Sequence, residues 1–200
     1  PDTAKLVSYI EKNLALLRNS GNGGDSQLYP LSYGCYVLQR LGASPADRDI
    51  DFILDSGNAD IPETAFCGLT YLAEGNPAKA QQAIRKIKQH MSLTTQGCTI
   101  TPVKRDLFRW QYLGGRSEQY ALSLMLFTEF DRTDTYNGHI LYELLQQMKA
   151  SGGYWTSTAS TARVLAAVDV YIRENGLEST GFTAQALLDG RTFLSSSFKG

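Results

Sequence analysis

Helical segments of two kinds alternate along this chain, and the alternation restricts what it can fold into. Segments of the first kind are apolar around most of their circumference, namely 29–41, 63–74 and 117–130. Segments of the second kind have one apolar and one charged face, namely 2–18, 44–54, 79–91 and 137–149. Helices that are apolar all round have to be buried on several sides, whereas amphipathic helices face water. The pattern therefore predicts an all-α fold in which helical hairpins form either two concentric layers, inner and outer, or a curved stack.

A further inner helix is predicted after the stretch 151–158, Ser-Gly-Gly-Tyr-Trp-Thr-Ser-Thr. Its two glycines end the preceding helix, and Ser157, Thr158 and Ser160 are candidate N-caps for the next one. The expected buried stripe consists of Val164, Leu165, Val168, Tyr171 and Ile172, while Arg163, Arg173 and Glu174 lie off it. The residue types in this stretch indicate a role in packing and not in catalysis.

Two parts of the chain lose the helical period. Residues 94–115 contain the β-branched run Cys98–Val103 and a dense set of aromatic residues, which favours a long excursion with a short strand pair. Residues 182–198 alternate around Asp189-Gly190, which predicts a β-hairpin. We therefore expect a helical domain over 1–176 and a β segment over 177–200 that opens a following domain, as in a piece of a longer protein.

Composition excludes several function classes. The net charge is −1, with 42% hydrophobic and 20% charged residues, so no basic surplus is available for nucleic acid. No run of about 18 apolar residues is present to span a membrane, and the N-terminus lacks the apolar segment of a secretory signal.

Cysteine and histidine usage argues against a metal centre. The chain has neither a CxxC pair nor a Cys/His pair at zinc spacing, and its only histidines are His90 and His139. We expect Cys35, Cys67 and Cys98 to be buried thiols, with a disulfide as the alternative. No metal and no cofactor is predicted.

Four motifs, in order, resemble the α/α-toroid thioester domain of bacterial α2-macroglobulins. They are Tyr33–Gly42, Leu72–Ala80, Gly115–Leu122 and the Gly-Gly-Tyr-Trp-Thr-Ser-Thr run at 152–158 before an Ala/Leu-rich helix. Residues 180–198 resemble the strands that open the next macroglobulin-type β domain. The resemblance implies antiparallel helical hairpins in a partial α/α toroid of about four hairpins, with a short C-terminal β-hairpin.

The resemblance also implies a function. Such domains belong to large cell-envelope proteins that trap proteases: a bait segment is cut, the molecule rearranges and a buried thioester bonds the attacker. The family motif Cys-Gly-Glu-Gln does not occur in these residues, and Ala159 and Ser160 replace the glutamine and aspartate that often precede the final inner helix. The chain is therefore expected to be a non-catalytic scaffold.

The resemblance further suggests partners and a location. The expected partners are target proteases, through the full-length protein, and neighbouring macroglobulin-like β domains, at a periplasmic or cell-surface site. Because a thioester survives only where water is excluded, aromatic residues are expected at a dry interface with the neighbouring domain. The candidates are Trp110, Tyr112, Tyr154 and Trp155.

Two other functions stay open. α/α-Toroid enzymes such as terpene cyclases, prenyltransferases and glycosidases place acids at a cavity mouth, and the candidates here are Asp49 with Asp51 and Asp131 with Asp134. These acids lie on an outward helix or a turn, where solvated carboxylates are expected. A tetratricopeptide-like scaffold is the other alternative, prompted by Glu74–Ala80, although the inner helices are unevenly spaced.

Overall fold

The computed structural model describes residues 2–19, 27–101, 115–155, 157–177, 182–188 and 191–198. Its helices are α1 (Thr3–Asn19), α2 (Leu28–Arg40), α3 (Asp47–Asp55), α4 (Ile61–Ala73), α5 (Pro77–Lys88), α7 (Gly115–Phe130), α8 (Thr135–Ala150) and α9 (Thr158–Glu174). Its strands are β1 (Met91–Leu93), β2 (Cys98–Ile100), β3 (Phe182–Leu188) and β4 (Arg191–Phe198). The predicted all-α fold with a short C-terminal β-hairpin is confirmed.

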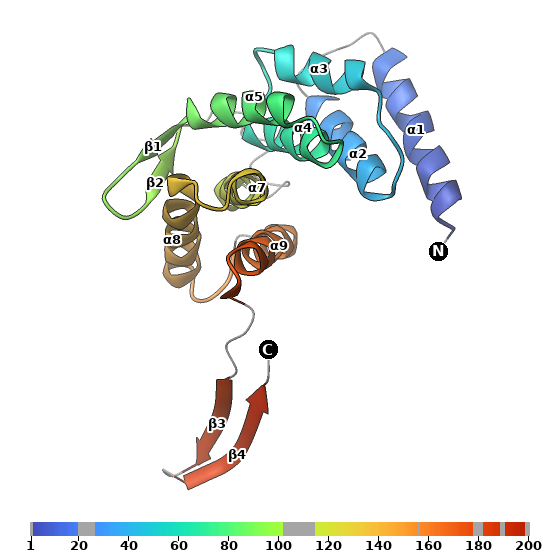
Figure 1. Ribbon diagram of the computed structural model, residues 1–200. Helices are drawn as coiled ribbons and strands as arrows, with labels where there is room; N and C mark the ends of the chain where they lie inside the picture. The colour runs from blue at the N-terminus through green and yellow to red at the C-terminus, as the bar shows by residue number, and fades with distance from the viewer. Residues whose placement is uncertain are drawn as a thin grey trace.

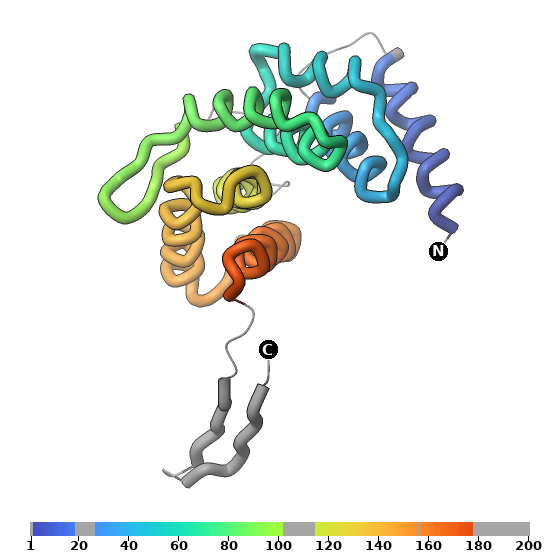
Figure 2. The backbone as a smooth tube through the Cα atoms, in the orientation of Figure 1, coloured from blue at the N-terminus to red at the C-terminus, as the bar shows by residue number. Residues whose placement is uncertain are grey.

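The helices form two layers. The inner helices α2, α4, α7 and α9 contact one another in this order, and α3, α5 and α8 pack beside consecutive pairs of them (Figure 1). All residues of Ile61–Tyr71 in α4 and Ser117–Thr128 in α7 are buried. Two of the three segments that are apolar around most of their circumference, 63–74 and 117–130, thus form the centre of the molecule, as predicted. Helix α1 lies at the N-terminal edge of the helical array (Figure 2).

Helix α2 is less buried than predicted. Only one face is covered, at Leu28, Leu31, Ser32, Cys35 and Leu38. The reason is its place in the array, because α2 packs against α4 but has no second inner helix on its other flank among the described contacts. Its Tyr33 side is therefore open.

Helix α9 is rotated relative to the prediction. Its N-cap is Ser157, as expected, whose hydroxyl accepts a hydrogen bond from the Ser160 amide at 3.1 Å. Its buried residues are Ser160, Val164, Ala167 and Val170, and Leu165 is 56% exposed. Of the predicted stripe, Val164 is buried and Val168 and Tyr171 pack against the core, whereas Leu165 does not. Arg163, expected to lie off the stripe, points inward to the buried Glu118 carboxylate.

Side-chain caps position several helix starts. Asp60 Oδ1 accepts from the Ile61 amide at 2.8 Å and begins α4, and Asn76 Oδ1 accepts from the Lys79 amide at 3.3 Å and begins α5. Ser44-Pro45 does not begin α3 as predicted: Ala46 is the N-cap and Asp47 is the first helical residue. Met91 does not extend α5 but is the first residue of β1.

Two antiparallel strand pairs are present in the described residues. In the first, Met91 pairs with Ile100 and Leu93 pairs with Cys98. The Tyr120 hydroxyl of α7 donates to the Cys98 carbonyl at 2.8 Å and fixes this hairpin to the helical core. In the second, β3 pairs with β4, with an irregularity at Ala186/Leu187.

Candidate functional site

A charged pair lies where three inner helices meet. Arg163 of α9 donates from Nε to Glu118 Oε1 of α7 at 2.7 Å, and the Tyr29 hydroxyl of α2 donates to the same oxygen at 2.7 Å. Arg163 also donates from Nη2 to the Tyr29 oxygen at 3.4 Å. Because the Glu118 side chain is only 5% exposed, this pair is largely removed from water.

Aromatic rings surround the guanidinium group. The Arg163 Cζ atom lies 4.9 Å from the Tyr33 ring centroid and 5.0 Å from that of Phe66 in α4. The Tyr29 and Phe66 rings meet edge to face at 5.8 Å. Cations are attracted to ring faces at these distances, most strongly where water is excluded. We call Tyr29, Tyr33, Phe66, Glu118 and Arg163 the inner cluster.

The electrostatics of the inner cluster hold it in one protonation state. Burial, followed by the Glu118 charge, raises the pKa of Tyr29 well above its ordinary value. Burial lowers the pKa of Arg163, but the influence of Tyr29 and Glu118 outweighs it and the net shift is upward. At neutral pH Tyr29 is therefore a neutral donor and Arg163 a cation, which suits a fixed structural contact better than proton transfer.

A hollow of about 320 Å³ opens beside the inner cluster. We call it the concave hollow; its lining consists of Tyr33 and Tyr36 from α2, Leu122 and Met125 from α7, and Ala159, Ala162, Arg163 and Ala166 from α9. Burial is the main cause of the raised pKa of Tyr36. Aromatic walls with small residues opposite them offer space for apolar side chains of a partner.

Buried polar side chains, three of them acids, occupy the starts of the two central helices. Asp60 and Glu63 at the start of α4, and Glu118 and Gln119 near the start of α7, are all buried. Gln119 Nε2 donates to Asp60 Oδ2 at 3.4 Å, which joins the two helix ends. Sequence reasoning missed these acids, although a signal was available for Glu63 and Glu118: each lies at the start of a segment that is otherwise largely apolar.

The acids considered for an enzyme do not converge. Asp51 on α3 pairs with Lys79 at 2.8 Å, Asp134 caps α8 and pairs with Lys88, and Asp131 accepts from the Thr133 hydroxyl at 2.6 Å. Each of these carboxylates stabilises its local structure. Asp49 was expected to be solvated, but it is 4% exposed, because Arg18 covers it.

The predicted interface residues have different surroundings. Tyr154 is 62% exposed in the connection between α8 and α9. Trp155 is 8% exposed, and its indole N–H donates to the Leu144 carbonyl of α8 at 3.0 Å. Of this pair, only the Tyr154 ring is open to a neighbour. Trp110 and Tyr112 lie outside the described residues.

The cysteines and histidines hold structural positions. Cys35, Cys67 and Cys98 are free and buried, as predicted. His139 Nδ1 lies 3.1 Å from the Gly97 carbonyl, and His90 follows the end of α5. In the part of the chain that the structure describes, no three His, Cys, Asp or Glu side chains are grouped to hold a metal ion. None of the described helices has the length and apolar character needed to cross a bilayer.

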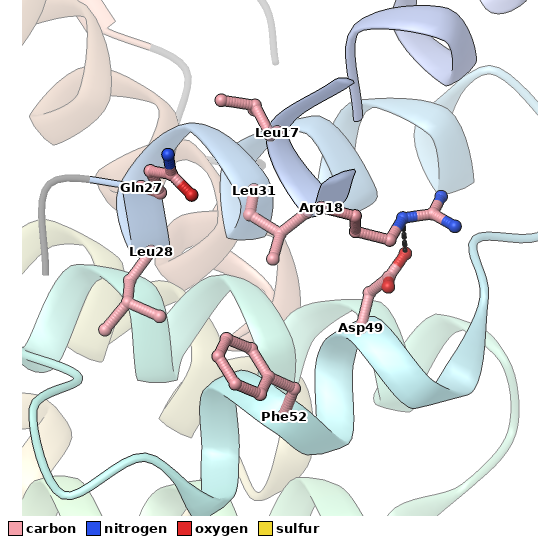
Figure 3. A pocket seen from close by; sticks show the side chains of 7 residues that line it. All are labelled: Leu17, Arg18, Gln27, Leu28, Leu31, Asp49 and Phe52. Atoms are coloured by element: carbon pink, nitrogen blue, oxygen red, sulfur yellow. Dashed lines mark ion pairs between the residues drawn. The ribbon is translucent and has the colours of Figure 1, made fainter. Parts of the chain in front are cut away.

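A second hollow, of about 160 Å³, lies where α1, α2 and α3 meet. We call it the end hollow; its lining consists of Leu17, Arg18, Gln27, Leu28, Leu31, Asp49 and Phe52 (Figure 3). Arg18 Nε lies 3.1 Å from Asp49 Oδ2, and this ion pair forms one side of the hollow. Leu28, Leu31 and Phe52 supply apolar lining away from this pair, and the Gln27 amide lies beside Leu28.

Comparison with models of protein families, with curated proteins and with solved structures finds no match for this chain. Its function therefore has to be argued from the geometry and from the motifs in its own sequence.

Proposed function

We propose that this chain is a non-catalytic helical scaffold that presents a contact surface to neighbouring domains in a protease-trapping protein of the α2-macroglobulin type. Three observations support the proposal. The four sequence motifs resemble the toroid domain of that family, and the helices alternate between an inner and an outer layer. A short β-hairpin follows the last helix, where the resemblance implies the next β domain.

The observation that carries the scaffold role is the arrangement around Glu118. A catalytic carboxylate has to reach substrate, whereas Glu118 is held by Tyr29 and Arg163, each at 2.7 Å. These contacts connect α7 to α2 and α9, which are far apart in the sequence. This buried charge pair thus supports the shape of the inner layer.

The contact surface in this proposal comprises the concave hollow and Tyr154. The concave hollow combines aromatic rings with apolar neighbours, and the Tyr154 ring is largely exposed; exposed aromatic and apolar groups are typical of surfaces that a partner covers. Neighbouring β domains are the proposed occupants, and target proteases would be met only through the full-length protein, in the periplasm or at the cell surface. A thioester cysteine would lie outside these 200 residues.

Footprinting of tyrosine side chains tests the proposal. Hydroxyl-radical modification would be compared between the 200-residue chain and the full-length protein that contains it. We expect Tyr33 and Tyr154 to be protected in the full-length protein, because a neighbouring domain covers them. Tyr9 on α1, which is also exposed, is the control and should be modified equally in both.

Two results would count against the scaffold role. Equal modification of Tyr33 and Tyr154 in the two samples would show that no domain covers these two residues. Unchanged protection after a protease has cut the full-length protein would contradict the rearrangement that a trap requires.

A toroid hydrolase or cyclase is the second candidate, and the buried acids Asp60 and Glu63 at the start of α4 favour it. The scaffold proposal would be replaced if the wild-type chain turned over an oligosaccharide or a prenyl diphosphate and Glu63→Gln abolished this turnover.

The tetratricopeptide alternative fits less well, because helix lengths run from 9 to 17 residues and an equal repeat is not maintained.

A further inference from the structure

We infer that the end hollow between α1, α2 and α3 is a binding site for a compact ring compound that carries one hydrogen-bond donor, such as a phenol. This site is separate from the concave hollow, and it does not depend on the proposed scaffold role.

The first argument is size and lining. The end hollow has a volume of about 160 Å³, and Leu28, Leu31 and Phe52 form much of its wall. An apolar cavity of about 150 Å³ is large enough to take up a benzene molecule. Figure 3 shows the Phe52 ring between α3 and α2, facing Leu28 and Leu31. A single ring therefore fits this space.

The second argument is an acceptor with unused capacity. Asp49 Oδ2 is buried and accepts no hydrogen bond from the described residues, although Arg18 Nε lies 3.1 Å away. The charges attract at this distance, but the N–H group does not point at the oxygen closely enough for a hydrogen bond. A buried carboxylate oxygen without a donor is unfavourable, so a donor group on a ligand would be stabilised there.

The third argument concerns charge. Arg18 already balances the Asp49 carboxylate, and Arg48 approaches its other oxygen at 3.9 Å. A cationic ligand would meet these two arginines, and an anionic one would meet Asp49. Burial raises the pKa of Asp49 against the opposing effect of Arg18, which reflects how little water reaches the carboxylate. A neutral donor such as a hydroxyl group therefore suits the site best.

Fluorine NMR titration of the 200-residue chain with 4-fluorophenol and fluorobenzene tests the inference. The two probes differ by one hydroxyl group. We expect saturable binding of 4-fluorophenol at least about tenfold tighter than that of fluorobenzene, because a hydrogen bond to a charged acceptor is worth that much. Asp49→Asn should reduce this preference, and Phe52→Ala should weaken both probes.

Tyr9→Ala is the matched control, because it removes an exposed aromatic side chain from α1, outside the end hollow. It should leave both affinities within about twofold, whereas Phe52→Ala should lower them about tenfold. Far-UV circular dichroism verifies that each variant is folded. If Asp49→Asn is unfolded, the affinities of the two probes for the wild type and for Phe52→Ala decide the question. The inference is overturned if 4-fluorophenol shows no saturable binding, if fluorobenzene binds equally well, or if Tyr9→Ala weakens binding as much as Phe52→Ala.

Discussion

Glu118 shows what a single charge does inside an apolar layer. A carboxylate in this position is costly unless hydrogen bonds and an opposite charge accompany it. Tyr29 and Arg163 supply both, and the ring of Phe66 covers the guanidinium group. Three inner helices are thereby joined at one oxygen atom, so a change at this residue acts on the packing of all three.

The inner cluster should show strong coupling between its two charges. Removing one partner by Glu118→Gln or Arg163→Met leaves the other poorly compensated, so each variant should lower the free energy of unfolding by about 3–5 kcal/mol. The double variant should lose less than the sum of the two, because no lone charge remains. Urea unfolding followed by circular dichroism measures all three.

An exposed pair provides the comparison for this cycle. Asp169 and Arg173 on α9 lie 3.4 Å apart with half or more of each side chain exposed. Asp169→Asn should change the unfolding free energy by no more than about 0.5 kcal/mol. Additive losses in the inner cluster would contradict the coupling argued above.

Asp51 should make stability depend on pH in the acid range. The hydrogen bond from Lys79, followed by that from Tyr71, lowers the pKa of this carboxyl below its ordinary value of 3.8. The unfolded chain therefore takes up the proton first, so the stabilisation is present above about pH 4 and is lost as pH falls through the lowered pKa. Asp51→Asn should be less stable than wild type at pH 7 and should lose less stability from pH 4 to pH 2. Parallel thermal unfolding profiles of the two proteins over this range would refute the prediction.

At the scale of the helices, the sequence predicted the type of each helix and its layer better than it predicted which face of the helix is buried. Apolar residues all around 63–74 and 117–130 leave only one environment for α4 and α7, and the structure has them there. In α9, apolar residues lie on more than one face, so periodicity could not identify the buried one. The inward position of Arg163 depends on Glu118, which is 45 residues away, and such a tertiary contact is invisible to a local pattern.

Candidate sites were harder to predict than elements. Asp49 lies on a short amphipathic helix, and its burial depends on Arg18 from another helix. The end hollow is likewise assembled from three helices. Burial of a polar group could be anticipated only where the surrounding segment is apolar, as with Glu63 and Glu118.

The contact between α4 and α7 requires a glycine at position 68. A Cβ atom there would lie 2.7 Å from Leu126 Cδ2 and 3.0 Å from Ala83 Cβ. Gly68→Ala should therefore lower the free energy of unfolding by about 1–2 kcal/mol, since overpacking outweighs the gain in helix propensity. Chemical denaturation measures the loss.

The same substitution at Gly138 in α8 is the matched control. A Cβ atom there would have no neighbour within 4 Å. Gly138→Ala should stabilise the protein by about 0.5–1 kcal/mol through helix propensity alone. A stabilising effect at Gly68 would show that α4 and α7 are not packed as closely as the structure has them.

For the molecule as a whole, the layered arrangement implies a gradient of local stability. Helices α4 and α7 are covered along most of their length, whereas α2 and α9 are covered on one face and the β1–β2 pair is short. Local opening requires little loss of packing at the edges and nearly complete unfolding at the centre. The three cysteines report on this gradient, because Cys67 lies in α4, Cys35 in α2 and Cys98 in β2.

The rate of cysteine labelling under native conditions should therefore depend on how well the surrounding helix or strand is covered, and not on how deeply the thiol itself is buried. All three thiols are free and buried, and burial raises the pKa of Cys35 and of Cys98 to about 12 and that of Cys67 well above its ordinary value. A thiol in this state reacts only after an opening event. We expect Cys98 to be labelled first, Cys35 next and Cys67 last, with peptide mass spectrometry resolving the order.

The labelling rate of Cys67 should rise with urea concentration as steeply as the rate of global unfolding does, because α4 opens only when the core does. Labelling of Cys67 as fast as Cys98, or with a shallower urea dependence, would mean that α4 is not the centre of the fold.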